Sequence, residues 1–168
     1  MPTGSCLCGD VKYKYEGEPT MKVSRLYRSI WNYRREDFYH SLFSTLKLFQ
    51  AICHCLTCRK ITGSTYSTNI VVPEDRFTII SNSQPKSSFT DLHESGLKIT
   101  PQTCAECGSA AAKRGTGPFE GTVIVQCGTL DDKNGLTVLA KPDAELWVKH
   151  RVPWLAPIEG TQQCQEFS

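Results

Sequence analysis

The amino-acid sequence predicts a single, mainly β domain built from several short antiparallel strands. Short runs rich in Val, Ile, Thr and aromatic residues are separated by Gly, Pro and Ser, which is typical of strands joined by turns. A chain of 168 residues is long enough to bury one core. Its nine prolines and its hydrophobic content of 39% favour a soluble, loop-rich protein.

The first expected strand covers residues 10–15, where apolar and polar residues alternate. Val11, Tyr13 and Tyr15 share one face, which predicts a half-buried strand. The run 122–128 is apolar and β-branched, so we expect it to lie buried at the centre of the sheet. Further strands are expected over residues 66–72, 76–81, 88–91, 97–100 and 145–148, with a loop or short helical turn over 59–64 and a frayed tail over 162–168.

The nine cysteines include one compact run of three. Cys53, Cys55 and Cys58 have a Cys-x-Cys-x-x-Cys spacing, which lets three sulfurs converge on one soft metal ion. Zinc prefers four sulfur or nitrogen ligands in tetrahedral geometry, so three protein ligands leave one position for a reacting molecule. This run therefore predicts a catalytic or labile zinc site.

Two cysteine pairs lie far apart in the chain. Cys6 and Cys8 are near the first residue, whereas Cys104 and Cys107 come almost a hundred residues later. Together the pairs supply four thiolates, and a site with four protein ligands has no position left for a substrate. The two pairs therefore predict one closed, structural zinc site, which brings the expected number of Zn²⁺ ions to two.

The sequence is also compatible with other uses of the cysteines. Disulfides are one alternative, but the number of cysteines is odd, and the first residues lack the basic and apolar regions of a secretory signal. Redox thiols and a single zinc ion are further alternatives. Clustered cysteines in a reducing compartment favour metal binding, and we expect a cytoplasmic protein. Cys127 is expected to be a core residue, and Cys164 to have no particular role.

Composition argues against two classes of partner. No apolar run approaches the ~20 residues that a membrane-spanning helix needs. The net charge is +2, but residues 23–50 contain five basic and two acidic residues. The remainder of the chain therefore has no net positive charge that would form a basic face for nucleic acid. We expect neither membrane nor nucleic-acid binding.

Residues 23–50 differ from the rest of the chain. They contain no Gly, Pro or Cys, but seven of the sixteen aromatic residues. Two interpretations stay open. Phe38, Leu42, Leu46 and Phe49 have the spacing of an amphipathic helix, which predicts a helical insertion. Alternatively, the first two residues can be encoded by a 5′ splice-site sequence and Gln50 by the last codon of an intron, which predicts a retained intron.

The cysteine clusters and their neighbours resemble a known family. Gly-Ser-Cys-x-Cys-Gly, Cys-His-Cys-x-x-Cys-Arg-Lys-x-x-Gly-Ser and Cys-x-x-Cys-Gly-Ser, in this order, are similar to the CENP-V/GFA domain of glutathione-dependent formaldehyde-activating enzymes. The run from Cys127 and the later Trp154 also resemble that family. The resemblance implies a zinc-ribbon-like β-tent fold. It also implies that the structural zinc ligands are Cys6, Cys8, Cys104 and Cys107, and that the catalytic zinc ligands are Cys53, Cys55 and Cys58.

The open zinc site and the resemblance together predict carbon–sulfur lyase chemistry. A thiol such as glutathione would take the fourth position, lose its proton, and add to or leave a small electrophile such as an aldehyde. The alternative is a non-catalytic zinc module for protein interaction, in which Cys127 or a histidine completes the triad. His54 is expected to point away from the sulfurs of its two neighbours. Near the triad, Arg59 could stabilise the thiolates or an anionic substrate, or could equally lie in solvent.

Overall fold

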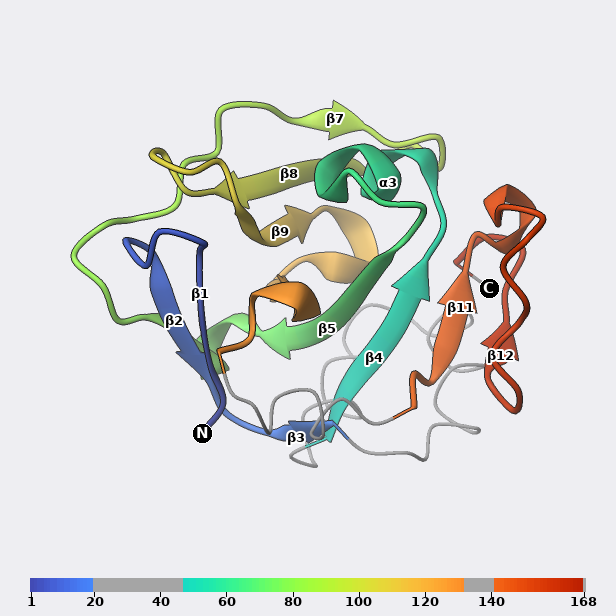
Figure 1. Cartoon of the computed structure of the whole chain (residues 1–168), viewed down its shortest axis with the longest axis horizontal. Helices are drawn as coiled ribbons and strands as arrows, with labels where there is room; N and C mark the ends of the chain where they lie inside the picture. The colour runs from blue at the N-terminus through green and yellow to red at the C-terminus, as the bar shows by residue number, and fades with distance from the viewer. Residues whose placement is uncertain (20–46, 132–140, 168) are drawn as a thin grey trace.

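The computed structural model describes residues 1–19, 47–131 and 141–167, and these residues form two β-sheets (Figure 1). The small sheet has the strand order β1-β2-β6. The nine-stranded sheet has the order β12-β11-β4-β5-β10-β9-β8-β7, with β3 paired to β4 outside this path. The strands are β1 (Thr3–Ser5), β2 (Lys12–Tyr15), β3 (Glu18–Pro19), β4 (Lys47–Cys53), β5 (Ser67–Pro73), β6 (Phe77–Ile79), β7 (Asp91–Leu92), β8 (Lys98–Thr103), β9 (Ala110–Gly115), β10 (Thr122–Gln126), β11 (Ala144–Leu146) and β12 (Gln162–Gln163).

Helical structure in the described ranges is limited to short pieces. The α-helix α3 (Leu56–Thr62) follows β4 and ends at Gly63, which has a left-handed backbone conformation. Four 3-10 turns are η1 (Glu74–Arg76), η2 (Gly117–Phe119), η3 (Cys127–Thr129) and η4 (Val148–His150). No helix among the described residues is long and apolar enough to cross a membrane. The predicted mainly β fold with short antiparallel strands is therefore confirmed.

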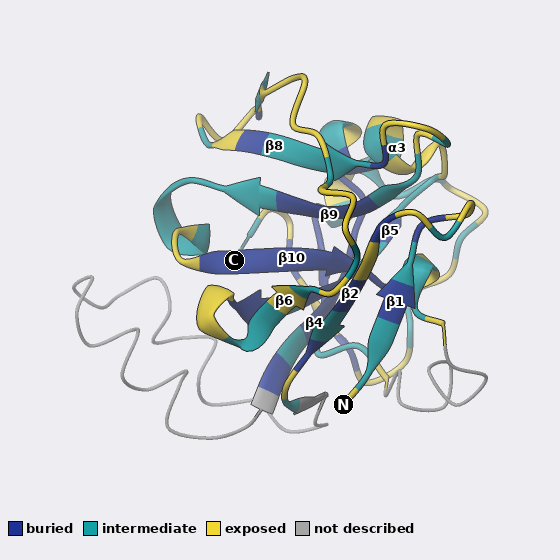
Figure 2. Cartoon of the chain, turned by 90° about the vertical axis from the view of Figure 1, so that its left-hand side faces the viewer, coloured by how far each residue is buried: buried dark blue, intermediate teal, exposed yellow. Residues whose placement is uncertain are grey.

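Strand β10 has the central position that its sequence predicts. It lies between β5 and β9, and all five of its residues are buried (Figure 2). The predicted run 122–128 is longer than the strand, because Cys127 and Gly128 turn into η3. A strand that is covered on both faces needs apolar side chains on both, which explains the unbroken apolar sequence.

The two faces of the large sheet support two separate cores. On β4, Leu48 packs into a core with Tyr13 and Tyr15 of the small sheet. Neighbouring side chains on a strand point to opposite faces. Ala51 and Cys53 accordingly belong to a second core, which also contains Cys55, Cys58, Ala144, Leu146, Trp147 and Cys164. The alternation along β4 thus decides which face of the sheet carries the first ligands of the cysteine triad.

The strand register brings one row of four side chains together on this second face. Phe49 of β4 pairs with Val71 of β5, Val71 pairs with Ile124 of β10, and Ile124 pairs with Lys113 of β9. Residues that are directly opposite one another in a sheet have neighbouring side chains on the same face. An apolar row therefore ends in a lysine, and this row forms part of the cavity described below.

Two elements differ from the sequence expectations. Strand β9 was not expected, because its sequence is rich in Ala, Lys and Arg and has no β-branched residue. The chain end is not a frayed tail: β12 pairs with β11, and Cys164 and the aromatic Phe167 pack with the second core. In both places contacts with neighbouring strands determine the structure, and these contacts cannot be predicted from the local sequence preference.

The structure describes the last four residues of the unusual segment 23–50 as part of β4. Leu48 is 2% exposed, and Phe49 pairs with Val71. A helix extending to Phe49 is therefore wrong, since that residue is in a strand. Residues 23–46 lie outside the described residues, and both the helical insertion and the retained intron stay predictions for them.

Candidate metal centre and its cavity

The cysteine triad is located where β4 ends and α3 begins. Cys53 is the last residue of β4, Cys55 is the N-cap of α3, and Cys58 lies in the first turn of the helix. The Cys55 sulfur accepts a hydrogen bond from the backbone N–H of Cys58 at 3.3 Å. The three ligand atoms lie within 4.8 Å of one another, and all three side chains are buried. The fold therefore brings the three sulfurs together in a compact group at a strand–helix junction.

The spacing of these sulfurs fits a tetrahedral metal ion. With Zn–S bonds of about 2.3 Å, two ligands of one zinc ion are roughly 3.8 Å apart. Sulfurs that all lie within 4.8 Å can meet this geometry after small side-chain adjustments. Among the described residues no His, Asp, Glu or further Cys joins the three sulfurs. The triad is therefore an open group, and Cys127, which lies in the other core, does not complete it.

Lys113 supplies a positive charge beside the triad. Its Nζ donates a hydrogen bond to Cys58 Sγ at 2.9 Å, and the side chain is 3% exposed. Burial lowers the pKa of Lys113, but the adjacent thiols, Cys58 first, outweigh it and leave the pKa above its ordinary value. Hydrogen bonds with Cys53 and Cys55, together with the Lys113 cation, hold the pKa of Cys58 well below its ordinary value. The site therefore favours an anionic sulfur.

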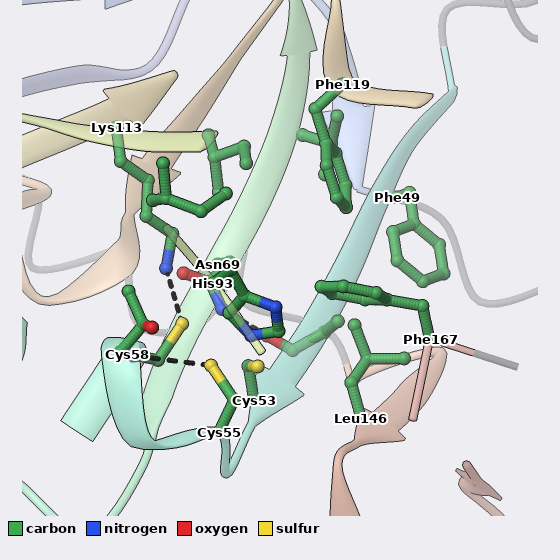
Figure 3. A pocket seen from close by; sticks show the side chains of 15 residues that line it. Phe49, Cys53, Cys55, Cys58, Asn69, His93, Lys113, Phe119, Leu146 and Phe167 are labelled. Carbon is green, nitrogen blue, oxygen red and sulfur yellow. Dashed lines mark hydrogen bonds between the residues drawn. The ribbon is translucent and has the colours of Figure 1, made fainter. Parts of the chain in front are cut away.

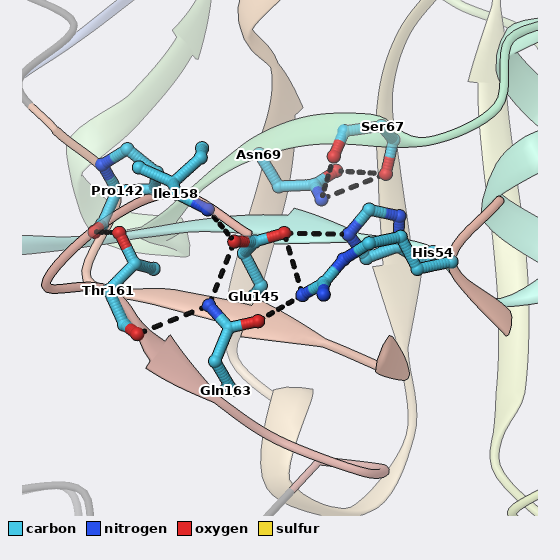
Figure 4. A network of polar contacts seen from close by, with 9 residues as sticks. His54, Ser67, Asn69, Pro142, Glu145, Ile158, Thr161 and Gln163 are labelled. Carbon is cyan, nitrogen blue, oxygen red and sulfur yellow. Dashed lines mark hydrogen bonds and ion pairs between the residues drawn. The ribbon is translucent and has the colours of Figure 1, made fainter. Parts of the chain in front are cut away.

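His54 points away from the sulfurs, as expected from its place between two of them. Its Nε2 donates a hydrogen bond to Glu145 Oε2 at 3.0 Å (Figure 4). Glu145 is 1% exposed and also accepts hydrogen bonds from Arg151 Nη2 at 3.1 Å, Gln163 Nε2 at 2.8 Å and the backbone N–H of Ile158 at 2.7 Å. This network fixes the backbone between Cys53 and Cys55 to the last two strands.

Glu145 is ionised in this setting. Burial raises the pKa of its carboxyl group, but hydrogen bonds from Gln163, Ile158 and His54 and the charge of Arg151 outweigh it, and the pKa lies below its ordinary value. Burial lowers the pKa of His54 more than Glu145 raises it, so the imidazole is neutral and donates from Nε2. A buried carboxylate with four donors and no unsatisfied oxygen is a rigid anchor for its neighbours.

Replacing Glu145 with Gln should destabilise the fold. The substitution removes the anion that faces the partly buried Arg151. It also replaces one carboxylate oxygen, an acceptor, with an amide NH₂ group that faces other donors. Loss of one partner from a buried charged network costs about 3–5 kcal/mol. Denaturant unfolding would measure the loss. The matched control is Glu166→Gln, which breaks a half-exposed pair with Lys149 and should cost less than about 1 kcal/mol. Equal losses in the two variants would contradict the anchoring role.

The second cysteine group joins two loops that are far apart in sequence. Cys6 and Cys8 lie between β1 and β2, and Cys104 and Cys107 lie between β8 and β9. The four ligand atoms lie within 4.8 Å of one another, with Cys8 Sγ 3.7 Å from Cys104 Sγ. The two loops have the same backbone pattern, because the N–H of Cys6 donates to Val11 and that of Cys104 to Ser109. A glycine with positive φ follows each pair, at 84° and 72° respectively.

A cavity of about 40 Å³ opens over the triad (Figure 3). Most of its wall is apolar and comes from segments that are far apart in the sequence, including Phe49, Phe119 and Phe167. The row Phe49–Val71–Ile124–Lys113 lines it as well. Its polar groups are the three cysteines, Thr57, Asn69, Lys113 and His93. The triad therefore lies at a small, mostly apolar chamber.

Sequence reasoning identified the cysteines but missed the rest of this chamber. Lys113 was hidden in the unexpected strand β9, and Phe167 in the supposed tail. His93 lies in a mostly polar stretch of the sequence, yet it is 3% exposed and packs against Trp147 and Phe167. The polar and basic residues that follow the triad do not line the cavity: Arg59 and Lys60 are absent from its wall, and Ser64 is exposed.

Comparison with protein families identifies the group to which this sequence belongs. The family described as "Glutathione-dependent formaldehyde-activating enzyme" matches residues 41–150, which are most of the chain and include the triad and the second cysteine pair. The chain belongs to this family. The resemblance seen in the sequence is thereby confirmed, and the family match begins before β4, within the segment 23–50.

No curated protein matches the sequence. Among solved structures, the chain is similar to a Rhodobacter sphaeroides protein at 14% sequence identity, with a TM-score of 0.45. The similarity covers 83% of this chain and 97% of that chain.

Proposed function

We propose that this member of the formaldehyde-activating family is a zinc-dependent carbon–sulfur lyase. Its substrate would be the adduct of a thiol such as glutathione with a small aldehyde. The open triad carries the proposal, because three converging sulfurs leave one tetrahedral position free and that position borders a cavity. The match to the family supports glutathione and formaldehyde as the first compounds to test.

Each group of residues has a stated part in this proposal. Cys53, Cys55 and Cys58 would hold a catalytic zinc ion, and Cys6, Cys8, Cys104 and Cys107 would hold a structural one. A bound zinc ion would lower the pKa of a thiol that takes the free position. The apolar wall excludes water, which strengthens the electrostatic interactions inside the cavity. The Lys113 cation offsets the negative charge of the thiolates.

Metal content and turnover together test the proposal. We expect two zinc ions per chain, of which mild chelation removes one. The intact protein should interconvert glutathione plus formaldehyde with their adduct, the chelated protein should lose this activity, and added zinc should restore it. One tight zinc ion, with no change in turnover on chelation, would contradict the proposal. A cytoplasmic location and the absence of nucleic-acid partners stay predictions.

A further inference from the structure

The imidazole of His93 has one buried nitrogen without a partner. The backbone N–H of Ser95 donates to His93 Nδ1 at 3.1 Å, and the Ser95 hydroxyl lies 2.7 Å from the same nitrogen. Because a backbone N–H can only donate, we assign Nδ1 as the acceptor, and the neutral ring then carries its hydrogen on Nε2. Nε2 is buried and has no hydrogen-bond partner among the described residues. An unsatisfied buried donor is uncommon and points to a missing ligand.

The position of this ring relates the free donor to the cysteine triad. His93 lines the same cavity as the three sulfurs, and in the view of Figure 3 its ring lies between them and the aromatic side chains. The ring is held in place by Trp147, at 4.8 Å between ring centroids, and by Phe167 at 5.3 Å. The loop itself is fixed by the hydrogen bond from the His93 backbone N–H to Leu97. The donor is therefore preorganised.

Lys113 provides a second donor in the same cavity. Its ammonium group has three N–H bonds, and within the described part of the chain two partners accept from them, Cys58 Sγ at 2.9 Å and Ser67 Oγ at a long 3.5 Å. At least one N–H bond is therefore available to a ligand. The register of β9 against β10 directs the side chain into the cavity rather than to solvent. The cavity thus contains two donors, His93 Nε2 and Lys113 Nζ, that can serve a ligand, in a mostly apolar wall beside the triad.

We propose that His93 Nε2 and Lys113 Nζ together bind the oxygen atom of the small electrophile. This inference rests on the proposed lyase function and adds to it a binding subsite for the aldehyde oxygen. A carbonyl oxygen has two lone pairs and no hydrogen, so it can accept from both donors at once. The whole cavity is about 40 Å³ in volume and its wall is mostly apolar, which suits the hydrogen or short carbon chain of a small aldehyde.

The subsite would act on the charge that develops during reaction. When the thiol sulfur attacks the carbonyl carbon, a carbon–sulfur bond forms and the π electron pair of the C=O bond moves to oxygen. The oxygen then takes up one proton, which balances the proton that the thiol has lost, so thiol plus aldehyde gives the hydroxyalkyl thioether. Lyase action is the reverse sequence. Donors that are already in place stabilise the developing negative oxygen without reorganisation.

Two substitutions remove the donors one at a time. Lys113→Met keeps the length of the side chain without its charge, and His93→Phe keeps a ring without its nitrogens. His93→Gln is the conservative partner, because its amide can still donate near the Nε2 position. Lys98→Met is the matched control, since it removes an exposed lysine from the neighbouring strand β8. A variant is used only if it retains both zinc ions and unfolds cooperatively on heating. Because the two donors come from different parts of the fold, each can be tested separately.

The first measurement does not depend on turnover. Formamide is a small, unreactive carbonyl compound, and its binding to the zinc-loaded protein can be followed by ligand-observed NMR. We expect its dissociation constant to rise about tenfold on loss of either donor, to be largely restored in His93→Gln, and to be unchanged in Lys98→Met. Equal binding of formamide to the unaltered protein and both loss variants, or no binding at all, would overturn the subsite.

The second measurement separates binding of the oxygen from binding of the thiol. In turnover of glutathione with formaldehyde, loss of either donor should lower kcat about 100-fold, as for other preorganised oxyanion donors. The affinity for glutathione alone should change less than about threefold. Parallel losses of kcat and thiol affinity would overturn the proposal, because the residues would then position the thiol. A chain that binds formamide through both donors but shows no turnover would contradict the lyase function and support the subsite.

Discussion

Cys104→Ser is expected to abolish the cooperative thermal unfolding of this protein and to leave the chain aggregated. Cys104 is 3% exposed and lies with Cys6 in the larger core. Its sulfur is one of four that connect the β1–β2 loop to the β8–β9 loop, across nearly a hundred residues. Zinc binding at a structural site contributes about 10–16 kcal/mol, which is as large as the total stability of most domains, about 5–15 kcal/mol.

Thermal melts followed by circular dichroism, together with metal analysis, would measure this effect. The matched control is Cys127→Ala, because Cys127 is 2% exposed in the same core but belongs to neither group of sulfurs. Removing one buried sulfur atom there should cost about 1 kcal/mol and should leave both zinc ions bound. A Cys104→Ser protein that melts cooperatively and retains two zinc ions would show that the four-sulfur site is not needed for folding.

The sequence is most informative where one local pattern is enough to determine a structure. The cysteine spacings predict both groups of sulfurs, because a Cys-x-Cys or Cys-x-x-Cys run restricts its two sulfurs to one small region. Strand β10 is equally clear, since a continuous β-branched run can be satisfied in a sheet only by burial on both faces. Val11, Tyr13 and Tyr15 show the alternation of a half-covered strand, and all three are buried.

The cavity could not be predicted in the same way, because its walls come from segments whose local preferences are misleading. The Ala-rich β9 has weak strand propensity, but its neighbours β8 and β10 supply hydrogen bonds on both edges. His93 follows a two-residue strand in a polar stretch, and only its contacts with Trp147 and Phe167 bury it. Phe167 is one residue from the end of the chain. The positions of these residues depend on tertiary contacts between residues that are far apart in the sequence.

The segment 23–50 shows how composition can make an unusual segment look longer than it is in the structure. Its aromatic and basic content differs from its surroundings over most of its length, yet Leu48 and Phe49 belong to the strand that leads to the triad. Composition averages over a window, whereas a strand depends on the alternation of single residues. The edge of the unusual segment therefore has to be determined from pairing, here between β4 and β5.

Cys55→Ser is expected to abolish turnover while the fold is kept. Cys55 is the N-cap of α3, where its sulfur accepts a hydrogen bond from the N–H of Cys58. Serine is among the preferred N-cap residues, so its hydroxyl can replace this contact and α3 should still begin at Leu56. A neutral hydroxyl is a poor zinc ligand compared with a thiolate. Loss of a direct ligand should lower activity more than the 10–100-fold typical of outer residues.

Turnover of the glutathione–formaldehyde adduct, zinc content and thermal melting should be measured on the same preparation. We expect one zinc ion per chain, a melt close to that of the unaltered protein, and no detectable turnover. Cys164→Ala is the matched control, because Cys164 lies in the same core but outside the triad, and both zinc ions and activity should remain. If Cys55→Ser instead unfolds as completely as Cys104→Ser, the triad is a structural site, and this result would favour the interaction-module interpretation. If turnover is unchanged, the reaction does not take place at the triad.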